Sequence, residues 1–282
     1  MIGRKVVQRL EAAGHDLRLL VRQCAPGSSA NAIIGDLLQP ATLSSWLDGC
    51  EIAIHLATAL KPGPTGQIDW ARNDAVRSSG TANLLEACKR AGVPRVVLQS
   101  VAFVASADPE SWSAGDEPLA DLPFLRSARE LESLAAASGL QTTILRGGLF
   151  YGPGTALSER WALSARSGVW HVPANADAWL SLIHVDDMAS AVSAAVSIPA
   201  AAGVLAIVDG SPVRWGDLQR GLAATCGGRI VTGAPASPLP SFRVSGQRAR
   251  ESLHWKPRYR CWREGLEHEH WWQSPPHADL HP

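Results

Sequence analysis

Short apolar runs alternate with amphipathic stretches through the first half of the chain, and this alternation most limits the folds open to it. The runs lie at residues 17–21, 52–56, 96–100 and 142–146. Residues 52–56 form an apolar run of the kind that is typical of a parallel strand covered on both faces. Residues 70–91 and 124–137 have helical apolar spacing. This order predicts βαβ units in a doubly wound parallel sheet, whose strands all end at one edge, where ligands bind.

The segment that opens the chain is predicted to be a helix with no strand before it. Val6, Val7 and Leu10 follow Gly3 at helical spacing, and Gly14 is placed to end the helix. Gly3 corresponds to the last glycine of a G-x-x-G-x-x-G dinucleotide-binding loop, where the absent Cβ lets the helix pack closely on the sheet. The first strand and the phosphate loop are missing from this sequence.

Two explanations account for the missing strand. Either the true start lies upstream, or the protein has lost the centre of its cofactor site. A truncated or misassigned start is the simpler expectation, because loss of a central strand would leave the backbone groups of its neighbours unpaired.

Composition and charge argue against several classes of function. Acidic and basic residues number 26 each in 282, so nothing indicates a nucleic-acid or membrane-surface partner. The N-terminus is too charged for a secretory signal, and the most apolar long stretch, residues 188–208, is broken by Pro199 and Gly203. The five cysteines form no C-x-x-C pair, which favours reduced thiols in a cytoplasmic protein and predicts no metal site.

Several short motifs follow one another in an order that is more specific than any one of them. They are Gly3, Gly35-Asp36-Leu37, His55-Leu56-Ala57, Asn73 with Gly80-Thr81, Gln99-Ser100, Leu145-Arg146, Tyr151-Gly152-Pro153-Gly154, His184-Val185-Asp186-Asp187 and Leu253-His254-Trp255-Lys256-Pro257. In this order and spacing the sequence resembles the NAD-dependent epimerase/dehydratase family, the extended and atypical short-chain dehydrogenases/reductases, over nearly its whole length.

The resemblance implies an α/β fold: a Rossmann-like doubly wound parallel sheet with a smaller C-terminal substrate-binding part. We expect an NAD(P)-binding domain over residues 1–150, with segments near 180–210 returning to it. A mixed substrate-binding part is expected over residues 151–272, and a disordered tail over 273–282.

The resemblance also implies which residues meet the cofactor. Asp36 and Leu37 would lie beside the adenine, and Leu56 and Ala57 would back the nicotinamide ribose. The remaining expected cofactor-binding residues are Gly3, Arg22, Asn73 and Arg146.

Arg22 decides the expected cofactor. It directly follows the second strand, where an acidic residue would bind the ribose 2′-hydroxyl in an NAD enzyme. An arginine there can pair with a 2′-phosphate instead, which favours NADP over NAD. The alternative for Arg22 is a solvated loop charge.

The catalytic group of the family is incomplete in this sequence. In the family a Ser or Thr, a Tyr and a Lys react together, the lysine lowering a phenol pKa that is ordinarily about 10. Ser100 matches the serine, but Phe124 and Ala128 occupy the Tyr and Lys positions of Tyr-x-x-x-Lys. Losing a positioned acid or base typically costs about 10² to 10⁴ in rate.

Substitutes for the missing groups are few. Arg126 or Arg129 could orient a substrate oxygen, and Tyr151 lies in the turn after a strand near the expected pocket. Other polar residues in the motifs have structural interpretations: His55 as a core or loop residue, His184 as a holder of a strand end, and Asp187 at the start of a helix. Trp161, Trp170 and Trp179 are expected to be packing residues, with a pocket lining as the alternative.

Three functional hypotheses follow. The first is an NAD(P)-binding oxidoreductase or epimerase-like protein, acting on a small carbonyl or hydroxyl compound or a nucleotide sugar with a non-standard acid. The second is a non-catalytic dinucleotide-binding sensor or scaffold, and the third an inactive truncated remnant. The expected partners are a small-molecule substrate and, from the resemblance, a second copy in a homodimer, with no nucleic acid or membrane.

Overall fold

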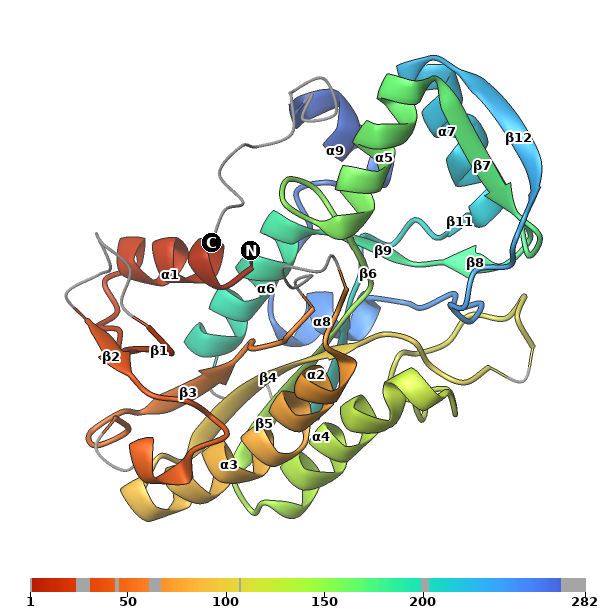
Figure 1. Ribbon diagram of the computed structural model, residues 1–282. Helices are drawn as coiled ribbons and strands as arrows, with labels where there is room; N and C mark the ends of the chain where they lie inside the picture. Colours follow the sequence, from red (N-terminus) through yellow and green to blue (C-terminus); the bar gives the residue numbers. More distant parts are fainter. Residues whose placement is uncertain are drawn as a thin grey trace.

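A parallel sheet of four strands forms the centre of the molecule (Figure 1). The computed structural model describes residues 2–23, 31–43, 46–60, 67–106, 108–198 and 203–269. In spatial order the strands are β10 (Gly203–Ile207), β5 (Gln141–Gly147), β4 (Arg95–Val101) and β3 (Ile52–His55). All three pairings are parallel, so the carboxyl ends of the strands share one edge. This confirms the predicted α/β class.

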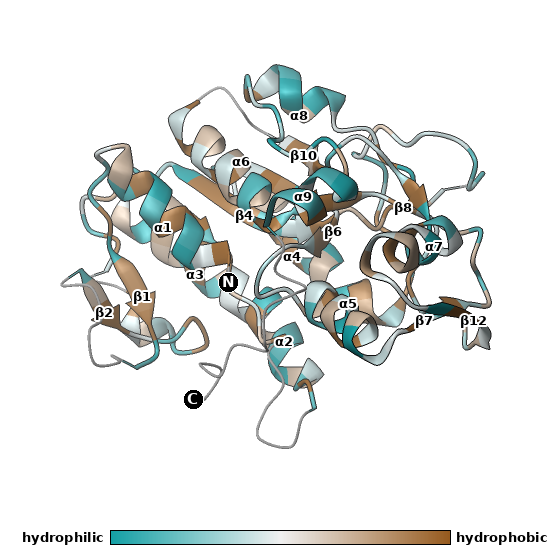
Figure 2. Ribbon diagram, turned by 90° about the horizontal axis from the view of Figure 1, so that it is seen from above, coloured by the Kyte–Doolittle hydropathy of each residue, from teal (hydrophilic) through white to brown (hydrophobic). Residues whose placement is uncertain are grey.

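Helices cover both faces of the sheet, as in a doubly wound fold (Figure 1). One face carries α1 (Ile2–Ala12) and α6 (Val185–Ser197). The other carries α2 (Trp70–Arg77), α3 (Ser79–Ala91) and α4 (Arg126–Ala137). Figure 2 shows hydrophobic strands lying between these helices, whose outward sides are more hydrophilic. Burial of apolar surface between the layers therefore forms the core of this half.

The expected long helix over residues 70–91 is divided in two at Ser78. Both the backbone N–H and the side-chain hydroxyl of Ser78 donate to the carbonyl oxygen of Asp74, each at 2.8 Å. A serine that bonds back in this way bends a helix, because its side chain competes with the regular backbone ladder. The break places Arg77 at the last position of α2.

The sheet is interrupted on its N-terminal side. β1 (Leu19–Val21) and β2 (Ala32–Ile34) pair in parallel with each other, but within the described ranges β1 does not pair with β3. In the order 3-2-1-4-5-6 a first strand stands between these two positions. The interruption thus falls where the sequence predicts a missing strand, and the cause of that absence stays a prediction.

The second half is built from small paired strands around a separate core. The strands are β6 (Leu149–Tyr151) with β9 (Leu182–His184), β7 (Val169–Pro173) with β12 (Arg229–Ala234), and β8 (Trp179–Leu180) with β11 (Val213–Arg214). The helices are α5 (Ala156–Ser167), α7 (Trp215–Cys226), α8 (Gln247–Ser252) and α9 (Trp262–Glu269), and the 3-10 turns are η1 (Pro40–Thr42) and η2 (Pro123–Leu125).

Four of the eleven tryptophans, Trp161, Trp170, Trp215 and Trp262, belong to this second core. Trp161 is 2% exposed and Trp170 is fully buried, so both are packing residues and line no open pocket. Trp179 is partly exposed and stacks between the guanidinium groups of Arg214 and Arg243, each 4.5 Å from its ring. The high tryptophan count is therefore a feature of the packing.

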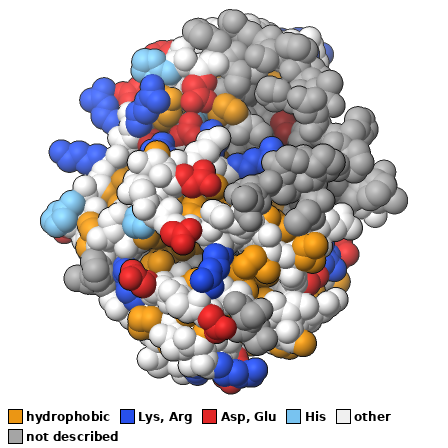
Figure 3. Space-filling view, turned by 90° about the vertical axis from the view of Figure 1, so that its left-hand side faces the viewer, with side chains coloured by type: hydrophobic (Ala, Val, Ile, Leu, Met, Phe, Trp, Pro, Cys, Tyr) orange, Lys and Arg blue, Asp and Glu red, His pale blue; other side chains and the backbone are white. Residues whose placement is uncertain are grey.

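The surface carries charges of both signs. Figure 3 looks onto the side of the molecule that is at the left in Figure 1, where acidic and basic side chains are interspersed. None of the helices in the described ranges is long and apolar enough to cross a membrane. The predicted disordered tail, residues 273–282, lies outside the described residues.

Candidate functional site

Most of the residues expected to bind the cofactor lie at the carboxyl edge of the parallel strands. His55 ends β3 and is followed by Leu56 and Ala57, Ser100 is near the end of β4, and Arg146 is near the end of β5. This edge is where open parallel sheets bind ligands, because the loops that follow the strands diverge there.

Two buried polar side chains hold the loop after β3. The Nδ1 atom of His55, which is 3% exposed, accepts the backbone N–H of Ala57 at 3.3 Å. The Oδ1 atom of Asn73, also 3% exposed, accepts the N–H of Ala59 at 3.2 Å. Burial, together with the nearby charge of Arg77, lowers the pKa of His55 from 6.5 to about 4, so its ring is neutral at pH 7. His55 is thus a loop-positioning residue, in agreement with the sequence analysis.

The residues expected beside the adenine are fixed by the helices that follow β3. Asp36 accepts a hydrogen bond from Arg72 on α2 at 3.1 Å. The carbonyl of Leu37 accepts the side-chain N–H of Asn83 on α3 at 2.8 Å. Gly80 allows this approach, since a Cβ there would lie 3.2 Å from the Cβ of Leu37.

A buried carboxylate, Glu132 on α4, joins the ends of β4 and β5. It accepts the hydroxyl of Ser100 at 2.6 Å and two guanidinium N–H groups of Arg146 at 2.9 and 2.6 Å. The third nitrogen of Arg146 donates to the carbonyls of Gly115 and Glu117 at 3.0 and 2.6 Å. Sequence analysis did not find the pair of Glu132 and Arg146, because residues 14 positions apart in the chain give no sign of such a contact.

This network holds the side chains of Ser100 and Arg146, both predicted site residues, in the protein interior. Arg146 is 3% exposed, and all three of its guanidinium nitrogens are bonded to protein. Ser100 is fully buried and donates its proton to Glu132, which leaves only its lone pairs for another partner. Ser100 can therefore accept a hydrogen bond from a bound hydroxyl, and it does not supply a proton in this arrangement.

The Tyr and Lys positions carry apolar side chains in the structure as well. Phe124 lies in η2 and packs against the second core, while Ala128 on α4 is fully buried. Between them on the chain, Ser127 donates its hydroxyl to Asp74 on α2 at 2.7 Å. Neither position offers a titratable group.

Tyr151 is an unsuitable substitute acid. It is fully buried, its hydroxyl donates to the carbonyl of Cys261 at 3.2 Å, and burial raises its pKa far above the usual 10. Tyr259 also has a raised pKa, about 12, through burial and the nearby carboxylate of Glu269. Both tyrosines are therefore protonated, and they serve the packing of the second half.

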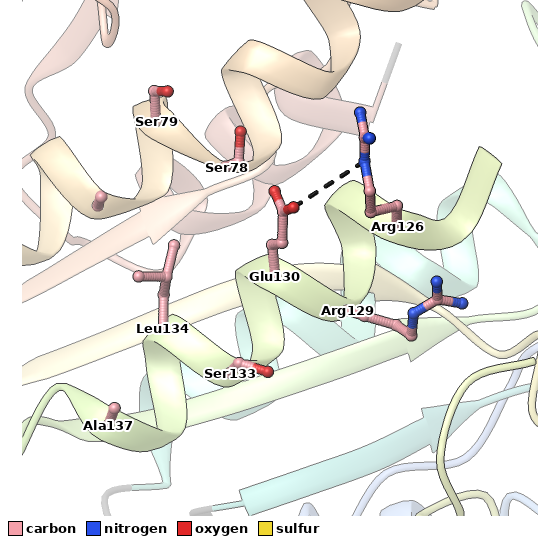
Figure 4. A pocket seen from close by; sticks show the side chains of 9 residues that line it. Ser78, Ser79, Arg126, Arg129, Glu130, Ser133, Leu134 and Ala137 are labelled. Atoms are coloured by element: carbon pink, nitrogen blue, oxygen red, sulfur yellow. Dashed lines mark ion pairs between the residues drawn. The ribbon is translucent and has the colours of Figure 1, made fainter. Parts of the chain in front are cut away.

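Arg126 and Arg129 face a groove on the outside of the molecule. Figure 4 shows both among the side chains that line this groove, which runs between α3 and α4. Arg129 donates to the carbonyl of Ala120 at 2.7 Å and pairs with Asp121 at 2.8 Å. Their guanidinium groups are therefore occupied or exposed, and away from Ser100.

The end of β9 is held by a cluster around His184. Its Nδ1 accepts the N–H of Asp186 at the start of α6, and its Nε2 lies 3.3 Å from a carboxylate oxygen of Glu269. His184, Asp186 and Glu269 have the geometry of a cation site, but the ammonium of Lys5 already lies 2.6 Å from Asp186. Asp187 accepts the N–H groups of residues 258 and 259 at 2.7 and 3.0 Å, which anchors the C-terminal segment.

Gly3 and Arg22 both belong to the N-terminal elements of the fold, and Gly3 lies within α1. Arg22 follows β1 and is exposed. The Cβ position of Gly3 has no heavy atom within 4 Å, so the close helix–sheet contact expected there is not made.

The fold and the edge residues define the class: an NAD(P)-binding protein with a Rossmann-type sheet. The family model described as NAD(P)H-binding matches residues 1–160. The chain belongs to this family. Its fold is similar to that of a short-chain dehydrogenase/reductase superfamily protein solved with NAD bound.

Two relatives and one solved structure match over nearly the whole chain. The 3-diazoavenalumate denitrifying reductase of a Streptomyces species is 32% identical over 95% of this chain and 97% of that protein. The ceramide reductase of Caulobacter vibrioides is 27% identical over 94% of this chain and 86% of that protein. The structure of MoeE5 with UDP-glucuronic acid and NAD has a TM-score of 0.78 and 25% identity, and the match covers 96% and 95% of the two chains.

Removing the charge of Glu132 should destabilise the fold. A Glu132→Gln substitution keeps the shape but leaves the buried guanidinium of Arg146 without its counter-charge, so we expect a loss of about 2–3 kcal/mol in the free energy of unfolding. Urea denaturation measures this loss. Glu130→Gln, on the solvent side of the same helix, is the matched control and should change stability by less than about 0.5 kcal/mol. Equal effects of the two substitutions would contradict the role assigned to Glu132.

His55 should make stability fall as the pH falls. Its folded pKa, about 4, is below its unfolded value of 6.5, so between these values the unfolded chain binds more protons. The stabilisation is therefore complete above about pH 6.5 and is lost as the pH falls towards 4. We expect the wild type to lose about 2 kcal/mol more than His55→Asn between pH 7 and pH 5, measured by urea denaturation. Parallel losses in the two proteins would show that His55 does not titrate in this way.

Proposed function

We propose that the protein is an NAD(P)-dependent reductase or epimerase-like enzyme for a small carbonyl or hydroxyl compound, with NADP as the preferred cofactor. The observation that carries this proposal is the gathering of Asp36, Ala57 and Ser100 at one sheet edge within the matched NAD(P)H-binding region. Arg22, exposed after β1, supports the preference for NADP through its capacity to pair with a 2′-phosphate.

The names of the relatives favour reduction over epimerisation. The two relatives described above are both named as reductases. The nucleotide sugar held by MoeE5 supports the alternative substrate class. A homodimer and a cytoplasmic location complete the proposal, on the family resemblance.

The proposed residue roles are mostly binding and positioning. The nicotinamide, when bound, supplies or takes up the hydride. Asp36 and Leu37 would hold the adenine end, and Leu56 and Ala57 the ribose end, because Asn73 and His55 fix that loop. Gly3 would lie near the phosphates. Ser100, held by Glu132, would accept a hydrogen bond from a substrate hydroxyl. Arg146 would contribute indirectly, by holding Glu132 in place.

A non-catalytic sensor is the second candidate, and a specific observation favours it. Phe124 and Ala128 remove the proton-transferring pair, and Tyr151 is buried and fully protonated. An inactive remnant is the third, favoured by the interruption between β1 and β3.

Cofactor binding is the test that separates these candidates. NADPH at one hundred times its Kd should stabilise the native state by about 2.7 kcal/mol and raise Tm by roughly 5 °C, with a smaller shift for the same concentration of NADH. Differential scanning fluorimetry of the full chain measures both. No shift with either dinucleotide would favour the remnant, and an equal shift with both would remove the preference for NADP.

Restoring the missing pair should restore the missing chemistry. In a protein that binds NADPH, the double substitution Phe124→Tyr with Ala128→Lys should raise turnover over a panel of carbonyl compounds by about 10². NADPH absorbance gives the rate, and Phe124→Tyr alone is the control, because an unassisted phenol has too high a pKa. Turnover by the wild type equal to that of the double variant would mean that another residue already supplies the proton.

A further inference from the structure

Arg77 is a buried cation with a missing partner. Its side chain ends α2 and is 5% exposed. The Nε atom is fully enclosed and has no hydrogen-bond acceptor, and within the described ranges the guanidinium forms no ion pair within 4.0 Å. Such an arginine is costly, because its Nε–H group has lost water without gaining an acceptor.

The two nearby carboxylates are already engaged. Asp74 and Glu132 are the charges that act on Arg77, and they oppose the lowering of its pKa by burial. Asp74, however, accepts the hydroxyl of Ser127, and Glu132 is held by Arg146 and Ser100. Their negative charges favour the charged form of the Arg77 guanidinium from a distance. They do not accept its hydrogen bonds.

The position of Arg77 is at the sheet edge that the cofactor is proposed to occupy. Its charge acts on His55, at the end of β3, and on Glu132, one helical turn beyond Ala128. The helix α2 packs on α4, where Asp74 meets Ser127. Arg77 therefore lies between the end of β3 and the helix that carries alanine where the family has lysine.

We propose that Arg77 is a ligand-binding residue, whose guanidinium donates hydrogen bonds to an oxygen of the molecule bound at the carboxyl ends of β3 and β4. It supplies from α2 the cation that α4 lacks at Ala128. The acceptor is an oxygen in either case: a hydroxyl of the nicotinamide ribose or the carbonyl oxygen of the substrate. This inference rests on the proposed function.

A purely structural role of Arg77 and a ligand-binding role predict different stabilities for the unliganded protein once Arg77 is replaced. If Arg77 only balanced Asp74 and Glu132, its removal would destabilise the unliganded fold. If it awaits a ligand, replacing it by an apolar side chain of similar length removes an unsatisfied buried cation. The unliganded Tm of Arg77→Met would then be equal to or higher than that of the wild type.

The experiment compares Arg77→Met and Arg77→Lys with the wild type, using the full chain. The Kd values of NADPH and of 2′,5′-ADP are measured by calorimetry, since 2′,5′-ADP has the adenine half but no nicotinamide ribose. Arg95→Met is the matched control: Arg95 is at the start of β4 and bonds to the carbonyls of Ala195 and Val196, far from the carboxyl edge. KM is measured for any carbonyl compound that the panel identifies.

For a ribose contact, Arg77→Met should raise the Kd of NADPH at least tenfold, leave that of 2′,5′-ADP within twofold, and be largely rescued by Arg77→Lys. For a substrate contact, the Kd of NADPH stays constant and KM rises about tenfold. The control should change neither affinity.

The proposal is overturned if Arg77→Met keeps the wild-type Kd and KM, whether or not its unliganded Tm falls. Where no compound is turned over, the Kd alone decides. If the wild type binds neither NADPH nor NADH, the proposed function and this inference are overturned together. If the wild type binds a dinucleotide and the variant matches it in Kd and KM, only this inference is overturned.

Discussion

The carboxylate of Glu132 is the group on which the organisation of the site depends. Through it α4 is bonded to the ends of both β4 and β5, and through Arg146 the same network reaches the loop at residues 115–117. A buried carboxylate and guanidinium repay their loss of hydration only when their remaining hydrogen bonds are made. Here they are, so the network fixes one arrangement of these elements.

That requirement also limits what the site can do. Because Arg146 and the proton of Ser100 are used to satisfy Glu132, neither is free to donate to a bound oxygen. Phe124 and Ala128 contribute no titratable group, and Arg77 is a buried cation nearby whose Nε atom lacks an acceptor. Glu132 pairs with Arg146 and Asp74 with Arg126, so Arg77 has no carboxylate of its own among the described ion pairs.

The sequence predicts the elements better than the contacts. The strands are predictable because short, mainly apolar runs bounded by turns are typical of strands in an α/β chain. The break of the helix at Ser78 was missed, because a serine bonds back to the preceding turn only in particular surroundings. The pairing of Glu132 with Arg146 and the burial of Arg77 depend on tertiary packing, and arginine is ordinarily a surface residue, so periodicity gives no sign of either.

The interruption of the sheet gives α2 a larger role than a crossover helix usually has. Side chains on both sides of the interruption pack into the same layers: Leu17 and Ile52 against the α1–α6 face, Leu20 and Ala53 with the α3–α4 face. No backbone ladder joins β1 to β3 within the described ranges, so side-chain contacts align them. Along α2, Arg72 holds Asp36 on the β2 side and Asn73 holds the loop after β3. Since Arg77 ends the same helix, the proposed ligand contact comes from the helix that also contacts the segments after β2 and β3.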